Sequence, residues 1–145
     1  MDGHALLLVG AVLVLVLFTF AVGTVLYLTR AREMRARRIH PQSVATSAQM
    51  AANLQNQQAA DNFRNLFEVP VMFYALAVMA VAIDHVTAWL VAGCWLFVAL
   101  RIAHSVIHCT YNRVMHRFYA YLGGLCVLIV LWLAWFGSLL GDGMT

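Results

Sequence analysis

Charged residues are scarce in this chain, and lysine is absent from it. Only 10% of the 145 residues are charged, all nine basic residues are arginine, and 63% of the residues are hydrophobic. A soluble domain of this size could not bury so much apolar surface, because roughly half of a folded protein's residues face water. The composition therefore excludes an ordinary soluble domain and predicts a membrane protein.

Four apolar runs are long enough to cross a bilayer, whose ~30 Å hydrocarbon core takes about 20 helical residues. They lack the strict alternation of β-barrel strands. The first run also lacks the basic segment and the short apolar core of a signal peptide. We therefore predict an all-α integral membrane protein, an antiparallel four-helix bundle in a single domain of residues 1–145. The predicted spans are residues 5–28, 66–83, 86–108 and 118–140.

Arginine is missing from three of the segments outside these spans. The arginines outside the spans lie in two connections, residues 29–65 and 109–117, whereas the termini and the turn at residues 84–85 have none. Because positively charged loops stay in the cytoplasm, we expect a multi-pass cell-membrane protein (the inner membrane in a Gram-negative cell) with both termini outside. The net charge of +3 then reflects topology and contact with anionic lipid rather than nucleic-acid binding.

The chain also lacks the cysteine pattern of a disulfide-bonded protein. Cys94 and Cys126 lie within spans at different depths, and Cys109 faces the reducing cytoplasm. We interpret all three as apolar packing residues. In the long connection, two alternatives stay open for residues 42–58, a helix and a disordered segment. The residues after them are expected to form a helix that runs into the second span.

Ionisable side chains are costly inside a membrane and mark candidate functional sites. Arg64 and Glu68 lie one helical turn apart at the start of the second span. Arg101, His104 and His108 share one helical face of the third. All lie in the cytoplasmic third, so we predict a polar pocket there; an Arg101–Glu68 pair that merely neutralises two charges is the alternative. The same region holds Asp61, Asn65, Ser105, Arg113, Arg117 and Tyr121.

Arginine outnumbers carboxylate in this pocket, so it suits a small polyanion whose carboxylates guanidinium groups bind bidentately. An apolar flank open to lipid would admit a hydrophobic second molecule. Metal and haem are not expected, because no glutamate lies between His104 and His108 and no other span offers a facing histidine. A small drug transporter would carry a carboxylate in its first span, which has none.

Three motifs, taken in order, resemble the MAPEG family, the membrane-associated proteins in eicosanoid and glutathione metabolism. They are R-N-L-F-E at 64–68, R-I-A-H at 101–104 and R-x-x-x-Y at 117–121. The chain length and four-helix topology match as well. The resemblance implies a homotrimer that takes glutathione as co-substrate and binds it between subunits, near the cytoplasmic face.

The resemblance also implies roles for single residues. Arg117 resembles the arginine that stabilises the glutathione thiolate, and Tyr121 resembles a tyrosine that contacts the tripeptide. A free thiol titrates at about pH 8.5 and reacts as the thiolate, so a neighbouring guanidinium raises the reactive fraction. The expected glutathione-binding residues are Arg64, Asn65, Glu68, Arg101, His104, His108 and Arg113.

The sequence departs from the family pattern at three positions. Asp61 stands where an arginine is common, His108 where a tyrosine is usual, and Phe118 where some members have a serine. Asp61 would repel a carboxylate, and Phe118 cannot hydrogen-bond a sulfur. Two functions are therefore expected. One is a glutathione-dependent transferase or peroxidase for lipophilic electrophiles or lipid hydroperoxides. The other is a non-catalytic protein of the same fold that binds a lipid, an anionic ligand or a protein partner.

Overall fold

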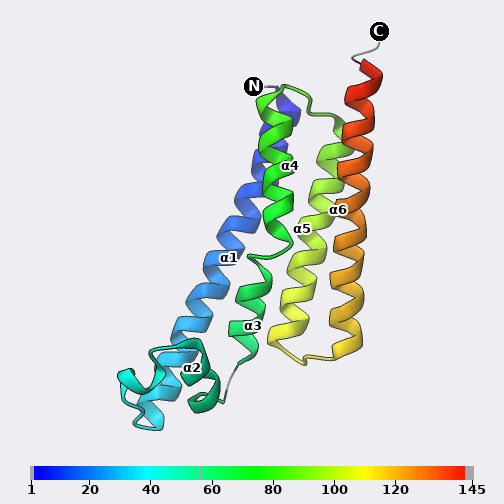
Figure 1. The fold of residues 1–145 in the computed structure, drawn as a ribbon. Coiled ribbons are helices and arrows are strands. Elements are labelled where there is room, and N and C mark those ends of the chain that lie inside the picture. Colours follow the sequence, from blue (N-terminus) through cyan, green and yellow to red (C-terminus); the bar gives the residue numbers. More distant parts are fainter. Residues whose placement is uncertain (1, 56, 143–145) are drawn as a thin grey trace.

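The structure, a computed structural model, describes residues 2–55 and 57–142. Over these residues the chain is all-helical, and four of its helical segments are long and apolar enough to cross a membrane. This confirms the predicted four-helix membrane bundle (Figure 1). The elements are α1 (Gly3–Ala36), η1 (Pro41–Val44), α2 (Ser47–Asn53), α3 (Gln58–Asn65), α4 (Pro70–Ala82), α5 (Ala88–Cys109) and α6 (Val114–Asp142).

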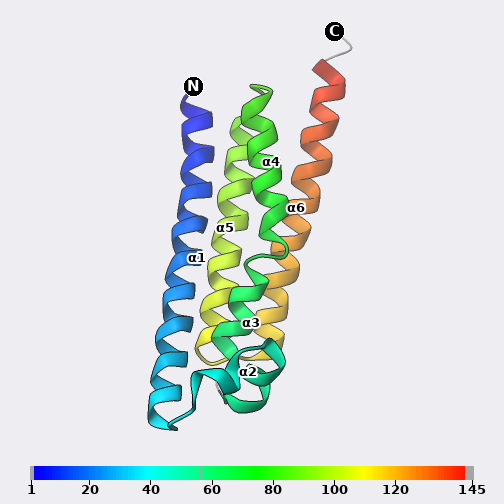
Figure 2. The ribbon, with the colours of Figure 1, turned by 60° about the vertical axis from the view of Figure 1, so that its left-hand side comes forward.

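The long helices run antiparallel, so the bundle has two distinct ends. The start of α1, the α4–α5 turn and the end of α6 lie at one end (Figures 1 and 2). The end of α1, η1, α2, α3 and the α5–α6 connection lie at the other, which we call the basic end because eight of the nine arginines belong to these segments and to the first turn of α6.

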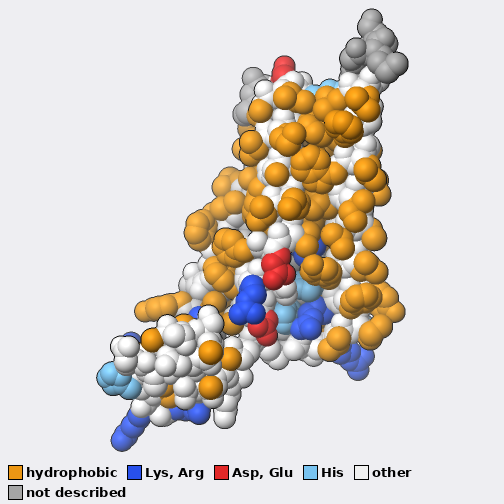
Figure 3. Space-filling view, in the orientation of Figure 1, with side chains coloured by type: hydrophobic (Ala, Val, Ile, Leu, Met, Phe, Trp, Pro, Cys, Tyr) orange, Lys and Arg blue, Asp and Glu red, His pale blue; other side chains and the backbone are white. Residues whose placement is uncertain are grey.

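Large aliphatic and aromatic side chains from all the long helices fill the centre of the bundle. The Phe73 ring stacks on the Phe97 ring with their centroids 5.1 Å apart, which joins α4 to α5. The Trp135 indole donates a hydrogen bond of 3.1 Å to the His85 carbonyl, which ties the α4–α5 turn to α6. Many other apolar side chains are exposed along the helices (Figure 3). A surface of this kind suits lipid or another subunit rather than water.

The second span is interrupted, which corrects our expectation that the preceding helix runs straight into it. α3 ends at Asn65 and α4 begins at Pro70, with a visible break between them (Figure 2). Proline has no N–H for the carbonyl one turn earlier and clashes with it, yet it suits the first position of a new helix. Within the break the backbone forms tighter i→i−3 hydrogen bonds, such as Glu68 N–H to the Asn65 carbonyl at 3.4 Å. The break therefore falls among the polar residues of this span.

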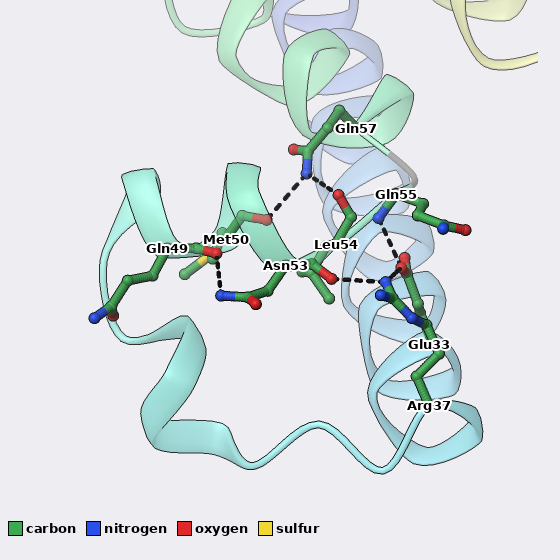
Figure 4. A network of polar contacts seen from close by, with 8 residues as sticks. All are labelled: Glu33, Arg37, Gln49, Met50, Asn53, Leu54, Gln55 and Gln57. Carbon is green, nitrogen blue, oxygen red and sulfur yellow. Dashed lines mark hydrogen bonds and ion pairs between the residues drawn. The ribbon is translucent and has the colours of Figure 1, made fainter.

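The segment of residues 42–58, for which a helix and a disordered segment were both open, holds the short helices η1 and α2. Residue 56 lies outside the described residues. Figure 4 shows how this connection is fastened to the last turns of α1. Arg37 Nη1 donates to Glu33 Oε1 at 2.8 Å and to the Asn53 carbonyl at 2.6 Å. The same Glu33 oxygen accepts from the Gln55 N–H at 2.7 Å. Glu33 thus joins α1 to the segment that enters α3.

Replacing Glu33 with alanine should open this connection to protease. The change removes hydrogen bonds to a charged group, each worth about 1.5–3 kcal/mol, so local opening becomes more frequent. We expect trypsin to cleave after Arg37 or Arg38 about tenfold faster in the detergent-solubilised protein, followed by intact-mass analysis. Asp2→Ala, which removes an N-cap contact at the opposite end, is the control and should leave the rate unchanged. Equal cleavage of Glu33→Ala and wild type would show that Glu33 does not hold the connection.

Candidate functional site

One face of α5 is polar and buried. Arg101, His104, Ser105 and His108 are each at most 4% exposed. They recur at intervals of three, one and three residues, which places them on one side of a helix. The buried positions nearer the start of α5 are apolar, so the polarity is confined to the part of α5 toward the basic end.

Polar atoms on this face have no hydrogen-bond partner among the described residues. Buried polar groups in native proteins are nearly always paired, and an unpaired one costs about 1–3 kcal/mol, or more when it is charged. A bound ligand or a second subunit that supplied partners would therefore be strongly favoured. The unpaired atoms are Arg101 Nε, Nη1 and Nη2, His104 Nε2, Ser105 Oγ and His108 Nδ1.

Arg101 and Glu68 form no ion pair within the described chain, so the alternative of two mutually neutralised charges is not found there. The Arg101 Cζ atom lies 5.1 Å from the centre of the Phe97 ring and 4.7 Å from that of the Tyr121 ring. Cation–π contacts contribute about 0.5–2 kcal/mol each, less than a desolvated charge loses. Glu68 instead is exposed and faces a cavity. Pairing of Arg101 and Glu68 across a subunit interface stays a prediction.

His104 links α5 to the first turn of α6. Its Nδ1 lies 3.0 Å from the Arg117 carbonyl oxygen. A carbonyl can only accept, so Nδ1 carries the proton, and in the neutral ring Nε2 is then a free acceptor. The His104 ring also contacts the rings of Tyr121 and His108, with centroids 5.6 and 5.7 Å apart. Through these ring contacts, and that of Arg101 with Tyr121, the four side chains form one connected group.

A cavity of about 270 Å³ opens beside this group at the basic end. Figure 3 shows acidic, basic and histidine side chains gathered there between apolar surfaces. Two carboxylates offset two guanidinium groups in the lining, so the lining lacks the excess of arginine that the sequence predicted. The lining residues are Asp61, Arg64, Asn65, Glu68, His108 and Arg117.

Arg117 is held in place by the turn between α5 and α6. Its Nη1 donates to Asn112 Oδ1 at 2.9 Å. Asn112 has a φ of 46°, in the left-handed region that asparagine adopts more readily than most residues. Its own N–H donates to the Ile107 carbonyl at 2.9 Å. Asn112 therefore positions Arg117, a role that our sequence reasoning missed although an asparagine in a short turn was a visible signal.

Gly124 and Phe97 are two further residues that sequence reasoning missed. A Cβ atom at Gly124 would lie 3.4 Å from Arg101 Nε, whereas one at Gly123 would meet only Leu100 at 3.7 Å. A Cβ at Gly124 would therefore just touch the Arg101 guanidinium, and a larger side chain would compete with it for space. Neither residue is polar, so only the three-dimensional packing could reveal its part in the site.

The structure brings most of the predicted site residues together. Arg113 is the exception: it is exposed and lines neither the cavity nor the buried group. Over the described residues, no three histidine, cysteine or acidic side chains are grouped so as to hold a metal ion. Five predicted residues line the cavity, namely Arg64, Asn65, Glu68, His108 and Arg117. Three contribute to the buried group, namely Arg101, His104 and Tyr121, with His108 common to both.

The fold and the site define a class of protein: a four-helix membrane bundle with an unpaired basic cluster and a polar cavity at one end. The family model of the MAPEG family matches residues 6–137, so the chain belongs to the MAPEG family. Proteins of this family are generally embedded in membranes, are often trimeric and generally use glutathione. A search of curated proteins and a search of solved structures each found no match.

Proposed function

We propose that the protein is a glutathione-dependent membrane transferase or peroxidase that acts on lipophilic electrophiles or lipid hydroperoxides. The observation that carries this proposal is the buried Arg101 guanidinium, whose three nitrogens have no partner among the described residues. A buried, unpaired cation is retained at a large free-energy cost. Arg101 does not line the cavity, so an anionic ligand would have to extend past His108 toward Arg101 to supply the missing acceptors.

The residues of the site fit glutathione chemically. Arg64, Asn65 and Arg117 offer donors to its two carboxylates. Asp61 and Glu68 offer acceptors to its ammonium group. The cavity of about 270 Å³ lies below the range of about 300–1,000 Å³ typical of ligand pockets. We therefore propose that a neighbouring subunit of a homotrimer supplies another wall.

Arg117 supplies the chemistry in this proposal. A fixed guanidinium near the sulfur stabilises the thiolate and so lowers the pKa of the thiol. In transfer, the sulfur forms a bond to an electrophilic carbon, the leaving group departs with its electron pair, and the thiol proton passes to water. In the peroxidase reaction, two glutathione molecules become one disulfide while a hydroperoxide is reduced to an alcohol and water. Tyr121 is proposed to contact the tripeptide.

The basic end is proposed to face the cytoplasm, with both termini on the other side of a cell membrane. Arginine-rich connections are retained on the cytoplasmic side, and the basic end carries such connections. The cytoplasm also holds the reduced glutathione pool. A site at this end therefore meets its thiol from the water and its hydrophobic substrate from the lipid.

The proposal is tested by turnover of the purified protein in detergent. Glutathione should be consumed with a chlorinated dinitrobenzene, measured as thioether formation, or with cumene hydroperoxide, measured as glutathione disulfide. Arg32→Gln, which changes an exposed arginine outside the cavity, should match wild type. No turnover with either substrate above that of empty detergent would overturn the enzymatic proposal.

The second candidate function is non-catalytic binding of an anionic ligand, a lipid or a protein partner. Asp61 favours it, because this carboxylate lines the cavity that glutathione carboxylates would have to enter. Phe118 also favours it, because it is 50% exposed and packs edge-on against Tyr119 rather than offering a hydroxyl. A metabolite or lipid copurified in stoichiometric amount, without turnover, would support this candidate. Turnover that depends on Arg117 would exclude it.

Gly124→Val should weaken glutathione binding, because the added side chain would take the space of the Arg101 guanidinium. Overpacking of this kind costs about 1–3 kcal/mol, so we expect the dissociation constant to rise about tenfold in a calorimetric titration. Gly123→Val is the matched control, since a Cβ there makes only ordinary contact with Leu100, and it should stay within about twofold. Equal effects of the two variants would show that Gly124 has no special part in the site.

A further inference from the structure

A second groove lies at the basic end, along α1. Its volume is about 850 Å³, and it shares no lining residue with the polar cavity. One wall is a stripe of α1 from Gly23 to Arg35, whose members repeat three and four residues apart, and Arg38 just beyond the helix continues it. The other walls are residues 39–41 and Phe63 of α3. The groove is therefore a separate feature of the fold.

One end of the groove is apolar. Leu26 and Phe63 form it, together with Gly23. A Cβ atom at Gly23 would lie 3.0 Å from Phe63 Cε2, so the glycine allows the aromatic ring to pack directly on α1. This end belongs to the membrane-spanning part of α1, where an acyl chain is the ordinary neighbour.

The other end of the groove carries unpaired positive charge. The side chains of Arg30, Arg35 and Arg38 line it and make no hydrogen bond or ion pair with any described residue. No acidic residue is part of the lining. Glu33 lies off this stripe and bonds instead to Arg37 and the Gln55 N–H (Figure 4).

His40 adds a neutral donor to the same end. Its Nδ1 accepts a hydrogen bond of 3.2 Å from the Gln42 N–H. The neutral ring then carries its proton on Nε2, which is free to donate. The basic end of the groove thus combines guanidinium groups and an imidazole donor, the groups that bind phosphate oxygens.

We propose that this groove binds an anionic phospholipid of the bilayer, with its phosphate on the arginines and an acyl chain along the apolar end. From Gly23 to Ala36, where α1 ends, the helix rises about 20 Å at 1.5 Å per residue, so head group and upper acyl chain fit one groove. The polarity of the groove follows that of a lipid monolayer, with positive charge at the surface and apolar side chains below. Each arginine near a membrane surface strengthens the attraction to anionic lipid about fivefold.

The test uses the full-length protein, delipidated in detergent and titrated with phosphatidylglycerol or phosphatidylcholine under native mass spectrometry. We expect one tightly held phosphatidylglycerol per chain and much weaker binding of phosphatidylcholine. Arg35→Gln combined with Arg38→Gln should weaken binding about twentyfold. Arg32→Gln is the control, because it removes one positive charge from the same stretch of α1 but not from the groove lining. Its affinity for phosphatidylglycerol should stay within about twofold of wild type. Equal binding of the two lipids, or a loss of about fivefold or more with Arg32→Gln alone, would overturn the proposal.

A second arm tests the shape of the groove without changing its charge. Ala31→Trp fills the groove between its two ends and should abolish tight phosphatidylglycerol binding while the thermal midpoint stays near that of wild type. Glycerophosphate, which has the anion without the acyl chains, should bind at least about tenfold more weakly. If glycerophosphate bound as well as the lipid, the site would be one for a soluble anion. If Ala31→Trp instead dissociated an oligomer in light scattering, the groove would be a subunit interface; either result contradicts the proposal.

Discussion

Replacing Arg101 with leucine should stabilise the ligand-free protein and abolish its binding of glutathione. The guanidinium is 1% exposed, and its nitrogens have no partner among the described residues. Replacing even a paired set of buried charges by apolar side chains is often neutral or stabilising by about 1–4 kcal/mol, and Arg101 has no partner to lose. We therefore expect a higher thermal midpoint for Arg101→Leu than for wild type in the same detergent. At a glutathione concentration of about 100 times the dissociation constant, the free energy of unfolding of wild type should rise by about 2.7 kcal/mol. That of the variant should hardly change.

The opposite signs of these two effects separate a binding role from a structural one. A residue that served only packing would destabilise the protein when replaced and would leave ligand-induced stabilisation intact. Arg32→Leu, at an exposed position, controls for loss of charge and should change neither quantity. A lower midpoint for Arg101→Leu in the absence of ligand would contradict our view that Arg101 is retained for a ligand.

Replacing Arg117 with alanine should lower kcat/KM by about 10²–10³, the effect of removing one donor to a developing negative charge. The same variant should lose the ultraviolet absorbance of bound thiolate at neutral pH, because the thiol pKa returns toward its ordinary value of about 8.5. The KM for glutathione should rise less than kcat falls, since Arg117 acts mainly on the sulfur. Activity of Arg117→Ala should recover at higher pH, where the free thiol ionises without help.

Asn112→Gly provides a graded comparison for Arg117. Glycine keeps the left-handed backbone of this turn but removes the Oδ1 atom that accepts from Arg117 Nη1 at 2.9 Å. We expect kcat/KM to fall about tenfold, between wild type and Arg117→Ala, with unchanged thermal stability. If Arg117→Ala were fully active at neutral pH, Arg117 would have no role in the reaction, and the comparison with Asn112→Gly would lose its basis.

The four-helix membrane architecture could be predicted from the sequence because each membrane span is a long run of apolar residues. Uninterrupted apolar length predicts the helices, and the spacing of Arg101, His104 and His108 predicts their common face. Both features depend on residues near one another in the chain. Both predictions can therefore be made without knowing how the helices pack.

The packing of the polar residues could not be predicted in the same way. The sequence left open whether Glu68 pairs with Arg101, because opposite charges at one depth can neutralise each other. In the structure Glu68 lies in the cavity lining just before the break at Pro70, while the rings of Phe97 and Tyr121 contact Arg101. Helical periodicity does not predict where a helix breaks. Nor does the sequence show that Phe97 contacts an arginine, because an apolar residue in a span can equally face lipid.

The most direct test of our central claim is a calorimetric titration of the purified protein with glutathione in detergent. We predict saturable binding of one glutathione per chain with a dissociation constant of about 1 mM or tighter, which is about −4 kcal/mol or better. The diethyl ester, in which both carboxylates are masked, should not bind, because the arginines then lose their bidentate acceptors. No saturable heat with glutathione, or equal binding of the ester, would contradict the claim that the unpaired cluster and its cavity form a glutathione site.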